Sequence, residues 1–427
     1  MFYRLLQFFL KWSLHFWFSR LYWINESNVP ERKPIIIASN HPNTFMEGIV
    51  MGFKLKRPVH YLARSDAFTS PFAAWLLGLL KVIPIYRQQE GPDNLSKNEE
   101  VFARCYEILA RGGAILIFPE GLSLIEKRLR PLKKGVARLS FGAEQSRQWQ
   151  LDLQVVPAGF TYSEAQRSFS ELLVAFGPPI PVRDLKGEYT DNPAKAINKF
   201  NETLAAELRK LIVEIHNPAQ DLLAELLFRI YRNEETDKWN PHDPERLRQQ
   251  QALASRLREI PATVLAELQE TAVQYTDLLR ECRLADSHFP KGTASPTFEL
   301  LIGAPLFLVS AFFAFPPFFV AGQITASKVK DPEFLAPVHL VLGLLLYLLW
   351  VAIIGIMSFY VSWPLGVTAI LFSLSGLYFP RYRRIFRLAS ARSRYAILLK
   401  KQPEVVATLT EQRNQLKQFI LKTLAKD

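Results

Sequence analysis

Short apolar runs alternate with longer segments of helical spacing between residues 31 and 190. Runs rich in β-branched residues and bounded by turn residues indicate strands, and the longer segments indicate helices. This alternation predicts an α/β fold with a largely parallel sheet and flanking helices. The expected strands are residues 34–38, 59–63, 82–86, 114–118, 153–159 and 172–176. The expected helices are residues 45–53, 71–80, 96–111 and 135–146.

The pattern changes on both sides of this α/β domain. Residues 1–30 are dense in aromatic side chains and carry scattered cations, which favours a helix lying in the membrane interface. A helix packed on the soluble domain is the alternative interpretation. Residues 191–295 predict a helical region in which no candidate chemistry is found. Its expected helices are residues 193–215, 219–232, 244–258 and 261–284.

Residues 296–380 form the expected membrane region, because they contain two long stretches without charge. A helix needs about 20 residues to span the hydrocarbon core, so residues 334–380 are predicted to form a hairpin of two spans, broken at 362–364. Three prolines interrupt the other stretch, residues 300–327, and a re-entrant or interfacial helix pair is expected there.

The last segment, residues 381–427, is a basic tail that ends in an amphipathic helix at about 404–424. Its arginine cluster follows the apolar stretch directly. Clusters of this kind lie on the cytoplasmic side of membranes. The tail is therefore expected in the cytoplasm.

Composition narrows the class of partner. The chain has 427 residues, is 49% hydrophobic and carries a net charge of +12. A basic surface indicates an acidic partner, namely nucleic acid, anionic lipid or a phosphorylated substrate. The long apolar stretches favour membrane lipids over nucleic acid. The two cysteines, Cys105 and Cys282, show neither metal spacing nor a disulfide pattern, and no zinc, P-loop or dinucleotide motif is present.

The strongest candidate chemistry lies where the first predicted strand of the domain passes into a helix. His41 follows the strand, and Glu47 falls in the first turn of the expected helix. A histidine and a carboxylate held in this way can act as a general base and the group that orients it. The alternative is a capping box from Thr44 to Glu47, in which Glu47 would bond only the backbone at the helix start.

Other polar residues follow the ends of predicted strands. Arg87, Glu120 and Gly121 come after two of them, and the carboxyl ends of parallel strands form the ligand crevice of such sheets. Arg87 is suited to a phosphate, and Glu120 to the hydroxyls of a polyol, with Gly121 allowing close backbone approach. Lys133 adds positive charge on a following loop. Each of these residues, taken alone, also fits an ordinary surface position or turn.

Four short motifs together resemble a known family. Asn40-His41 with a downstream acid, Ile83-Pro84-Ile85-Tyr86-Arg87, Phe118-Pro119-Glu120-Gly121 and Val156-Pro157-Ala158 occur in the order and approximate spacing of the glycerolipid acyltransferases. That family includes the bacterial 1-acyl-glycerol-3-phosphate acyltransferases. The resemblance covers about residues 20–185.

The resemblance implies a glycerol-3-phosphate acyltransferase-like fold and a membrane-bound O-acyltransferase. His41 would be the base and Glu47 its orienting carboxylate, and the substrates would contact Asn43, Arg87, Glu120, Gly121 and Lys133. Acyl-CoA or acyl carrier protein would be a co-substrate, with no metal or bound cofactor. The acceptor would be a phosphorylated glycerol, first of all 1-acyl-glycerol-3-phosphate in phospholipid synthesis. A catalytic domain that meets such a donor is expected in the cytoplasm.

One departure from the family pattern widens the choice of acceptor. The usual motif has four residues between His and Asp, whereas five separate His41 from Glu47. Five intervening residues resemble a branch that includes fungal-type glycerol-3-phosphate and dihydroxyacetone-phosphate acyltransferases, but that branch has Asp at the end. These acceptors and other lysolipids are therefore alternatives. A non-catalytic membrane scaffold with the same fold is the alternative from another class.

Overall fold

The computed structural model describes residues 2–68, 70–86, 92–234, 240–289 and 297–425. The chain divides into two compact units. The first comprises Met1–Glu214 and Asn240–Leu247, and the second comprises Ile215–Trp239 and Arg248–Asp427. The α/β domain lies in the first unit, and both long apolar segments lie in the second.

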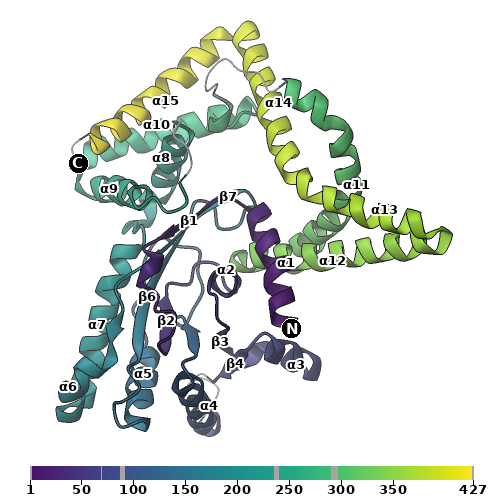
Figure 1. Ribbon diagram of the computed structural model, residues 1–427. Coiled ribbons are helices and arrows are strands. Elements are labelled where there is room, and N and C mark those ends of the chain that lie inside the picture. Colours follow the sequence, from purple (N-terminus) through teal and green to yellow (C-terminus); the bar gives the residue numbers. More distant parts are fainter. Residues whose placement is uncertain (1, 69, 87–91, 235–239, 290–296, 426–427) are drawn as a thin grey trace. The chain divides into compact units, whose positions relative to one another are not determined.

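An eight-stranded sheet forms the centre of the first unit (Figure 1). Its order is β1-β7-β6-β2-β5-β3-β4, with β8 paired to β6. Strands β2 to β6 run parallel, whereas β7 and β8 are antiparallel to β6, and β1 is parallel to β7. The strands are β1 (Phe18–Ile24), β2 (Ile35–Ser39), β3 (Val59–Arg64), β4 (Val82–Ile85), β5 (Ala114–Ile117), β6 (Gln154–Tyr162), β7 (Ser170–Phe176) and β8 (Ile180–Pro181). The largely parallel sheet expected from the sequence is confirmed.

Strand β2 lies at the middle of the parallel part, between β5 and β6. All five of its residues are buried, as expected for a parallel strand that is covered on both faces. Ile36 pairs with Ile115 of β5 and with Val155 of β6. The carboxyl ends of β2, β5 and β6 therefore meet at one edge of the sheet, and the chain leaves β2 there toward His41.

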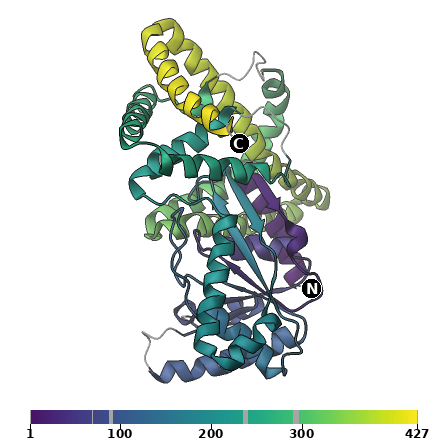
Figure 2. The same ribbon diagram turned by 90° about the vertical axis from the view of Figure 1, so that its left-hand side faces the viewer.

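Helices cover both faces of this sheet. Ile36 and Ala38 pack in one core cluster with residues of α4, α5 and α7, and α7 faces the viewer in Figure 2. Ile35 and Ile37 are equally buried and point to the opposite face, because side chains alternate along a strand. The helices of this unit are α1 (Phe2–Trp17), α2 (Met46–Lys54), α3 (Pro71–Leu79), α4 (Pro92–Ala110), α5 (Gly135–Ser146), α6 (Lys186–Asp191) and α7 (Pro193–Leu211).

The N-terminal segment differs from the interfacial helix expected over residues 1–30. The helix α1 ends at Trp17, and the chain continues directly as the edge strand β1, which pairs with β7. Tyr22 and Trp23 of β1 are buried. Aromatic residues suit strands as well as interfacial helices, so composition did not separate the two. Both elements belong to the first unit, which continues past the boundary expected at residue 30.

The C-terminal boundary of the α/β domain, expected at residue 190, lies further along the chain in the structure. Helix α7 packs on β6 so closely that a Cβ at Gly159 would collide with the backbone carbonyl of Leu211. The Val213 backbone N–H donates to the Thr161 side chain at 3.3 Å. The first unit therefore extends to Glu214. Helical spacing predicted α7 correctly but carries no information about which body the helix packs against.

The second unit is helical, as expected. Its helices are α8 (Asp221–Glu234), the greater part of α9 (Glu245–Glu259), α10 (Ala262–Glu281), α11 (Thr297–Lys328), α12 (Pro332–Val361), α13 (Trp363–Ser373), α14 (Phe379–Lys401) and α15 (Pro403–Leu424). Short 3₁₀ turns along the whole chain are η1 (Glu26–Asn28), η2 (Ser65–Ala67), η4 (Val182–Leu185), η5 (Pro218–Gln220), η6 (Asp286–His288) and η7 (Leu374–Tyr378).

The apolar region is arranged differently from the expected re-entrant pair followed by a hairpin. In the described residues two helices are long and apolar enough to cross a membrane, Leu300–Lys328 and Pro332–Val361, and the next apolar helix, Trp363–Gly376, is shorter. Helix α11 continues through its three prolines. A proline removes its own N–H donor and crowds the carbonyl of the preceding turn, and apolar helices that pack against a neighbour tolerate both effects. Helix α11 thus lacks the break expected in 300–327, whereas the break expected at 362–364 is present between α12 and α13. The number of membrane spans in 334–380 stays a prediction.

A buried polar cluster ties the C-terminal helix to the rest of the second unit. Arg413 of α15 donates from Nε to Oδ1 of the buried Asp286 at 2.8 Å, and from Nη1 to Glu234 at 2.6 Å. The Tyr275 hydroxyl donates to the same Asp286 oxygen at 2.7 Å.

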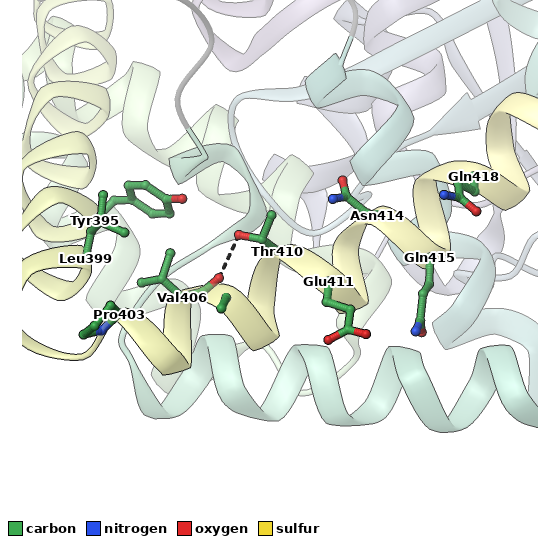
Figure 3. A pocket seen from close by; sticks show the side chains of 10 residues that line it. Tyr395, Leu399, Pro403, Val406, Thr410, Glu411, Asn414, Gln415 and Gln418 are labelled. Carbon is green, nitrogen blue, oxygen red and sulfur yellow. Dashed lines mark hydrogen bonds between the residues drawn. The ribbon is translucent and has the colours of Figure 1, made fainter.

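A pocket of about 690 Å³ lies along α14 and α15 and is lined by side chains such as Tyr395, Thr410 and Gln418 (Figure 3).

An internal ion pair of the first unit allows a stability test. Arg246 donates from Nη2 to Glu171 of β7 at 2.9 Å, and both side chains are buried. Arg20 Nη1 lies 3.6 Å from the other oxygen of Glu171, so Arg246→Ala leaves the buried carboxylate with one weaker partner. The first unit should therefore lose about 1–3 kcal/mol of stability. Hydrogen exchange of the β6 and β7 amides in the detergent-solubilised full chain measures this loss. Arg147→Ala, which removes an exposed pair with Glu107, should cost no more than about 1 kcal/mol.

Candidate active site

The turn that carries His41 is fixed by the strand beside it. Asn40, directly after β2, bonds the backbone of Phe160 in β6 twice. Its Nδ2 donates to the Phe160 carbonyl at 2.9 Å, and its Oδ1 accepts the Phe160 N–H at 2.7 Å. The two bonds continue the β2–β6 pairing one residue beyond the end of β2. The Asn-His order of the motif therefore places the histidine at the edge of the sheet.

His41 and Glu47 form a direct pair. The Nδ1 atom of His41 lies 3.1 Å from Oε2 of Glu47, which is in the first turn of α2. The Glu47 side chain is fully buried, and the His41 side chain is 16% exposed. Because an ionised carboxylate only accepts hydrogen bonds, Nδ1 carries the proton in this pair and Nε2 is the basic nitrogen of the neutral ring. The base-and-orienter geometry that the sequence suggested is present.

The alternative interpretation, a capping box, is wrong. Helix α2 has Phe45 at its N-cap position, and no side chain caps the helix start. Thr44 instead adopts a left-handed backbone with φ of 47°. The second oxygen of Glu47, Oε1, accepts from the Tyr162 hydroxyl at 2.8 Å. Both oxygens of Glu47 are thus engaged by side chains of the site.

The imidazole and the backbone of His41 have further contacts. The ring stacks on Phe118, with centroids 3.6 Å apart and planes 10° apart. The His41 N–H donates to Glu120 Oε1 at 3.0 Å, and the His41 carbonyl accepts from the Leu124 N–H at 3.2 Å. The segment after β5 therefore holds the histidine in place from one side, while β6 does so from the other.

Glu120 has a structural role that the sequence did not predict. Its Oε2 accepts the Arg130 N–H at 3.1 Å, so the two oxygens join the backbone at His41 and at Arg130. Burial raises the pKa of Glu120, and the two N–H donors act in the opposite direction. The proposed contact between Glu120 and a polyol stays a prediction. What the geometry provides is a carboxylate that closes the loop between residues 120 and 130.

Gly121 and Lys133 lie together at this loop. Gly121 has a φ of 72°, which favours glycine, and the Lys133 side chain lies 3.5 Å from where a Cβ at residue 121 would be. The Lys133 backbone N–H donates to the Pro119 carbonyl at 2.7 Å, and its side chain is exposed. The turn therefore places an exposed ammonium group next to Gly121.

Asn43 and Arg87 are the remaining predicted substrate contacts, and the structure describes only the first of them. Asn43 is fully buried, and its Nδ2 donates to the Ala165 carbonyl at 2.8 Å. Among the described residues its Oδ1 has no hydrogen-bond partner. Arg87 lies outside the described residues, so its predicted phosphate contact is not addressed. Strand β4, which leads to it, ends at Ile85.

Three residues of the site were given no role of their own by sequence reasoning. Phe118 stacks on the imidazole, Tyr162 bonds Glu47, and the Ser123 hydroxyl accepts the N–H of the left-handed Thr44 at 2.8 Å. Tyr162 was missed because the predicted strand stopped at residue 159, whereas β6 continues to Tyr162. A strand extended through Phe160, Thr161 and Tyr162, which all suit strands, would have brought it to the same edge.

The arrangement is suited to removing a proton from a hydroxyl. It supplies an imidazole whose Nδ1 is held by a buried carboxylate and whose ring is fixed by stacking. Within the described ranges, no group of three or more His, Cys, Asp and Glu side chains is placed to hold a metal ion.

The loop closed by Glu120 gives a test of its structural role. Glu120→Gln replaces one acceptor oxygen by an amide group, so either the His41 or the Arg130 N–H loses its partner. A buried donor left unpaired costs about 1–3 kcal/mol. We expect faster hydrogen exchange at these two amides and faster proteolysis between residues 121 and 130. Glu126→Gln, a partly exposed carboxylate of the same loop, is the matched control. Equal behaviour of the two variants would remove the role assigned to Glu120.

The comparisons with known proteins concern the same part of the chain. Residues 20–161 match the Acyltransferase family model. Glycerol-3-phosphate O-acyltransferase 1 of Saccharomyces cerevisiae is 29% identical over 142 residues, which cover 32% of this chain and 18% of that protein. The 1-acyl-sn-glycerol-3-phosphate acyltransferase of Pseudomonas aeruginosa is 31% identical over 118 residues, which cover 27% of this chain and 42% of that protein.

A solved structure is also similar. The 1-acyl-sn-glycerophosphate acyltransferase PlsC from Thermotoga maritima has 14% sequence identity and a TM-score of 0.36, over 48% of this chain and 79% of that chain. The matched region covers less than half of the length of each of the two curated relatives described in the previous paragraph. The family resemblance seen in the sequence motifs is confirmed by the family model and by these relatives. Residues 20–161, which hold both His41 and Glu47, therefore match the Acyltransferase family model and are similar to the corresponding part of these glycerolipid acyltransferases.

Proposed function

We propose that the protein transfers a fatty acyl group from a thioester donor to a hydroxyl of a phosphorylated glycerol acceptor. The observation that carries the proposal is the 3.1 Å contact between His41 Nδ1 and the buried carboxylate of Glu47, inside the segment that matches the family. The donor is acyl-CoA or acyl carrier protein, which acts as a co-substrate, and the reaction uses no metal or bound cofactor.

The mechanism follows from the orientation of the imidazole. His41 Nε2 takes the proton of the acceptor hydroxyl, and Glu47 stabilises the imidazolium that results. The alkoxide attacks the thioester carbonyl and forms a tetrahedral oxyanion. Collapse of this intermediate breaks the C–S bond, and the imidazolium returns its proton to the leaving thiolate. An ester and a free thiol are the products, and no acyl-enzyme forms.

The favoured acceptor is 1-acyl-glycerol-3-phosphate, and glycerol-3-phosphate or dihydroxyacetone phosphate is the second candidate. The Pseudomonas relative bears the name of the first activity and the yeast relative that of glycerol-3-phosphate acylation. Both classes of acceptor carry a phosphate, for which the sequence offers Arg87 and the exposed Lys133. Other lysolipids remain alternatives.

The proposal places the enzyme at a membrane, with the catalytic domain in the cytoplasm. Helices α11 and α12 have the length and composition of membrane spans. The net charge of +12 suits anionic headgroups and a phosphorylated substrate. Acyl donors and lipid products partition into the interface, so membrane attachment brings the site to its substrates.

Substitution of the two central residues tests the reaction. His41→Ala should abolish acyl transfer, because the base is lost. Glu47→Gln should lower kcat/KM strongly, by at most about 10⁴-fold, since it removes the charge that stabilises the imidazolium. The assay uses the full chain with labelled acyl-CoA or acyl carrier protein and a panel of glycerol-3-phosphate, lysophosphatidate and other lysolipids. Glu126→Gln serves as a control with normal turnover.

Two outcomes would contradict the proposal. Near-normal turnover in Glu47→Gln, with His41→Ala inactive, would show that Glu47 does not orient the base. Transfer by the wild-type chain to none of the acceptors, with both donor types, would favour the non-catalytic scaffold.

Phosphate recognition is tested at Arg87. Arg87→Ala should lower kcat/KM for the acceptor by about 10- to 150-fold, which corresponds to a lost charge-assisted contact of about 1.5–3 kcal/mol. The KM for the acyl donor should stay unchanged, and Arg147→Ala should leave both substrates unaffected. Unaltered acceptor kinetics in Arg87→Ala would remove this residue from the acceptor site.

A further inference from the structure

We propose that Tyr162 is a positioning residue of the acyl-transfer site, whose hydroxyl fixes the Glu47 carboxylate in the orientation that holds the His41 imidazole. This inference rests on the proposed function, because positioning has a kinetic meaning only if His41 acts as a base. It assigns a role to a residue outside the motifs by which the family is identified in this sequence.

The contacts at Glu47 carry the inference. Each carboxylate oxygen has its own partner, since Oε1 accepts from the Tyr162 hydroxyl at 2.8 Å and Oε2 lies 3.1 Å from His41 Nδ1. Glu47 is closed to solvent and Tyr162 is nearly so. A carboxylate closed to bulk solvent depends on such partners to satisfy its oxygens. The tyrosine therefore determines how the plane of the carboxylate is turned toward the imidazole.

A glutamate needs this second anchor more than an aspartate does. Its side chain has one more methylene and therefore one more freely turning bond between backbone and carboxylate. The terminal torsion of glutamate is broad and has no sharp preferred angle. One hydrogen bond to His41 leaves rotation about that torsion open, whereas bonds to both oxygens close it. Tyr162 thus compensates for the longer side chain of Glu47.

The tyrosine itself is rigidly held. It is the last residue of β6, where it pairs with Leu172 of β7, and its carbonyl accepts from Lys127 Nζ at 2.7 Å. Its ring lies 6.1 Å from that of Phe18. Burial, and then the charge of Glu47, raise the pKa of Tyr162 well above its usual value, while the Asn43 amide lowers it. The phenol accordingly stays protonated at neutral pH and donates to Glu47.

The geometry separates this role from a catalytic one. The Tyr162 hydroxyl is buried behind Glu47 and bonds the oxygen that does not face the imidazole. It therefore acts on the reaction through Glu47. Removing the hydroxyl should reduce the fraction of molecules in which His41 is correctly oriented, and this affects the chemical step more than substrate binding.

Kinetics of Tyr162→Phe test the role, with the full chain in detergent and the acceptor identified from the panel above. The variant should lower kcat by about 10- to 100-fold, the loss of one hydrogen bond to a charged group, with both KM values within about twofold. In a Glu47→Gln background the same change should cost less than about twofold, because residues that act as a unit are not additive. Equal losses in both backgrounds, or an unchanged kcat, would overturn the inference.

A matched variant controls for simple loss of stability. Tyr275, in the second unit, also donates its hydroxyl to a buried carboxylate, Asp286 Oδ1 at 2.7 Å. Tyr275→Phe makes the same chemical change outside the candidate site and should leave kcat unaltered. A comparable fall of kcat in Tyr275→Phe would mean that any such lost bond impairs the enzyme, and the inference would fail.

A second measurement does not depend on turnover. With ¹⁵N-labelled histidine, the hydrogen-bonded Nδ1–H of His41 should give a resonance that is lost in Glu47→Gln and shifted or broadened in Tyr162→Phe. It should be unchanged in Tyr275→Phe. An unaltered resonance in Tyr162→Phe would overturn the positioning role even if acyl transfer is observed. Absence of acyl transfer by the wild-type chain would instead contradict the proposed function, and the resonance would still decide whether Tyr162 holds the pair.

Discussion

A carboxylate buried in the first unit is the constraint on which the site depends. Glu47 is closed to solvent, and an unpaired buried carboxylate would cost several kcal/mol. Its two partners come from different elements, His41 after β2 and Tyr162 at the end of β6. The pairing of β2 with β6 therefore matters for chemistry as well as for the core. A shift of register by one residue would turn the tyrosine to the other face of the sheet.

A second buried carboxylate acts on the backbone instead of the ring. Glu120 receives the N–H groups of His41 and Arg130, whereas Glu47 contacts the imidazole. Burial raises the pKa of Glu120, and the hydrogen bonds from the Arg130 and His41 N–H groups lower it and so offset part of that rise. The two acids therefore have different structural roles. One fixes where the histidine backbone lies, and the other fixes how its ring is turned.

Local pattern was sufficient for the elements but not for their assembly. The runs of β-branched residues predicted β2 and β5, and the turn after β2 predicted the site of His41, because these signals lie within a few residues of each other. Tyr162 could not be assigned in this way, since its bond to Glu47 joins residues 115 positions apart. The same limit explains the boundary at Glu214. Helical periodicity describes the apolar face of α7 and not the strand that it covers.

The turn between His41 and Glu47 has an uncommon backbone conformation at Thr44. Thr44 takes a left-handed conformation, which is costly for a β-branched residue and persists only where the surroundings enforce it. Here the Ser123 hydroxyl accepts the Thr44 N–H, and α2 begins two residues later without a side-chain cap. From this turn, Oε2 of Glu47 lies 3.1 Å from His41 Nδ1. The left-handed turn and the tyrosine that bonds the other oxygen of Glu47 therefore act on the same group, because both determine where the carboxylate meets the imidazole.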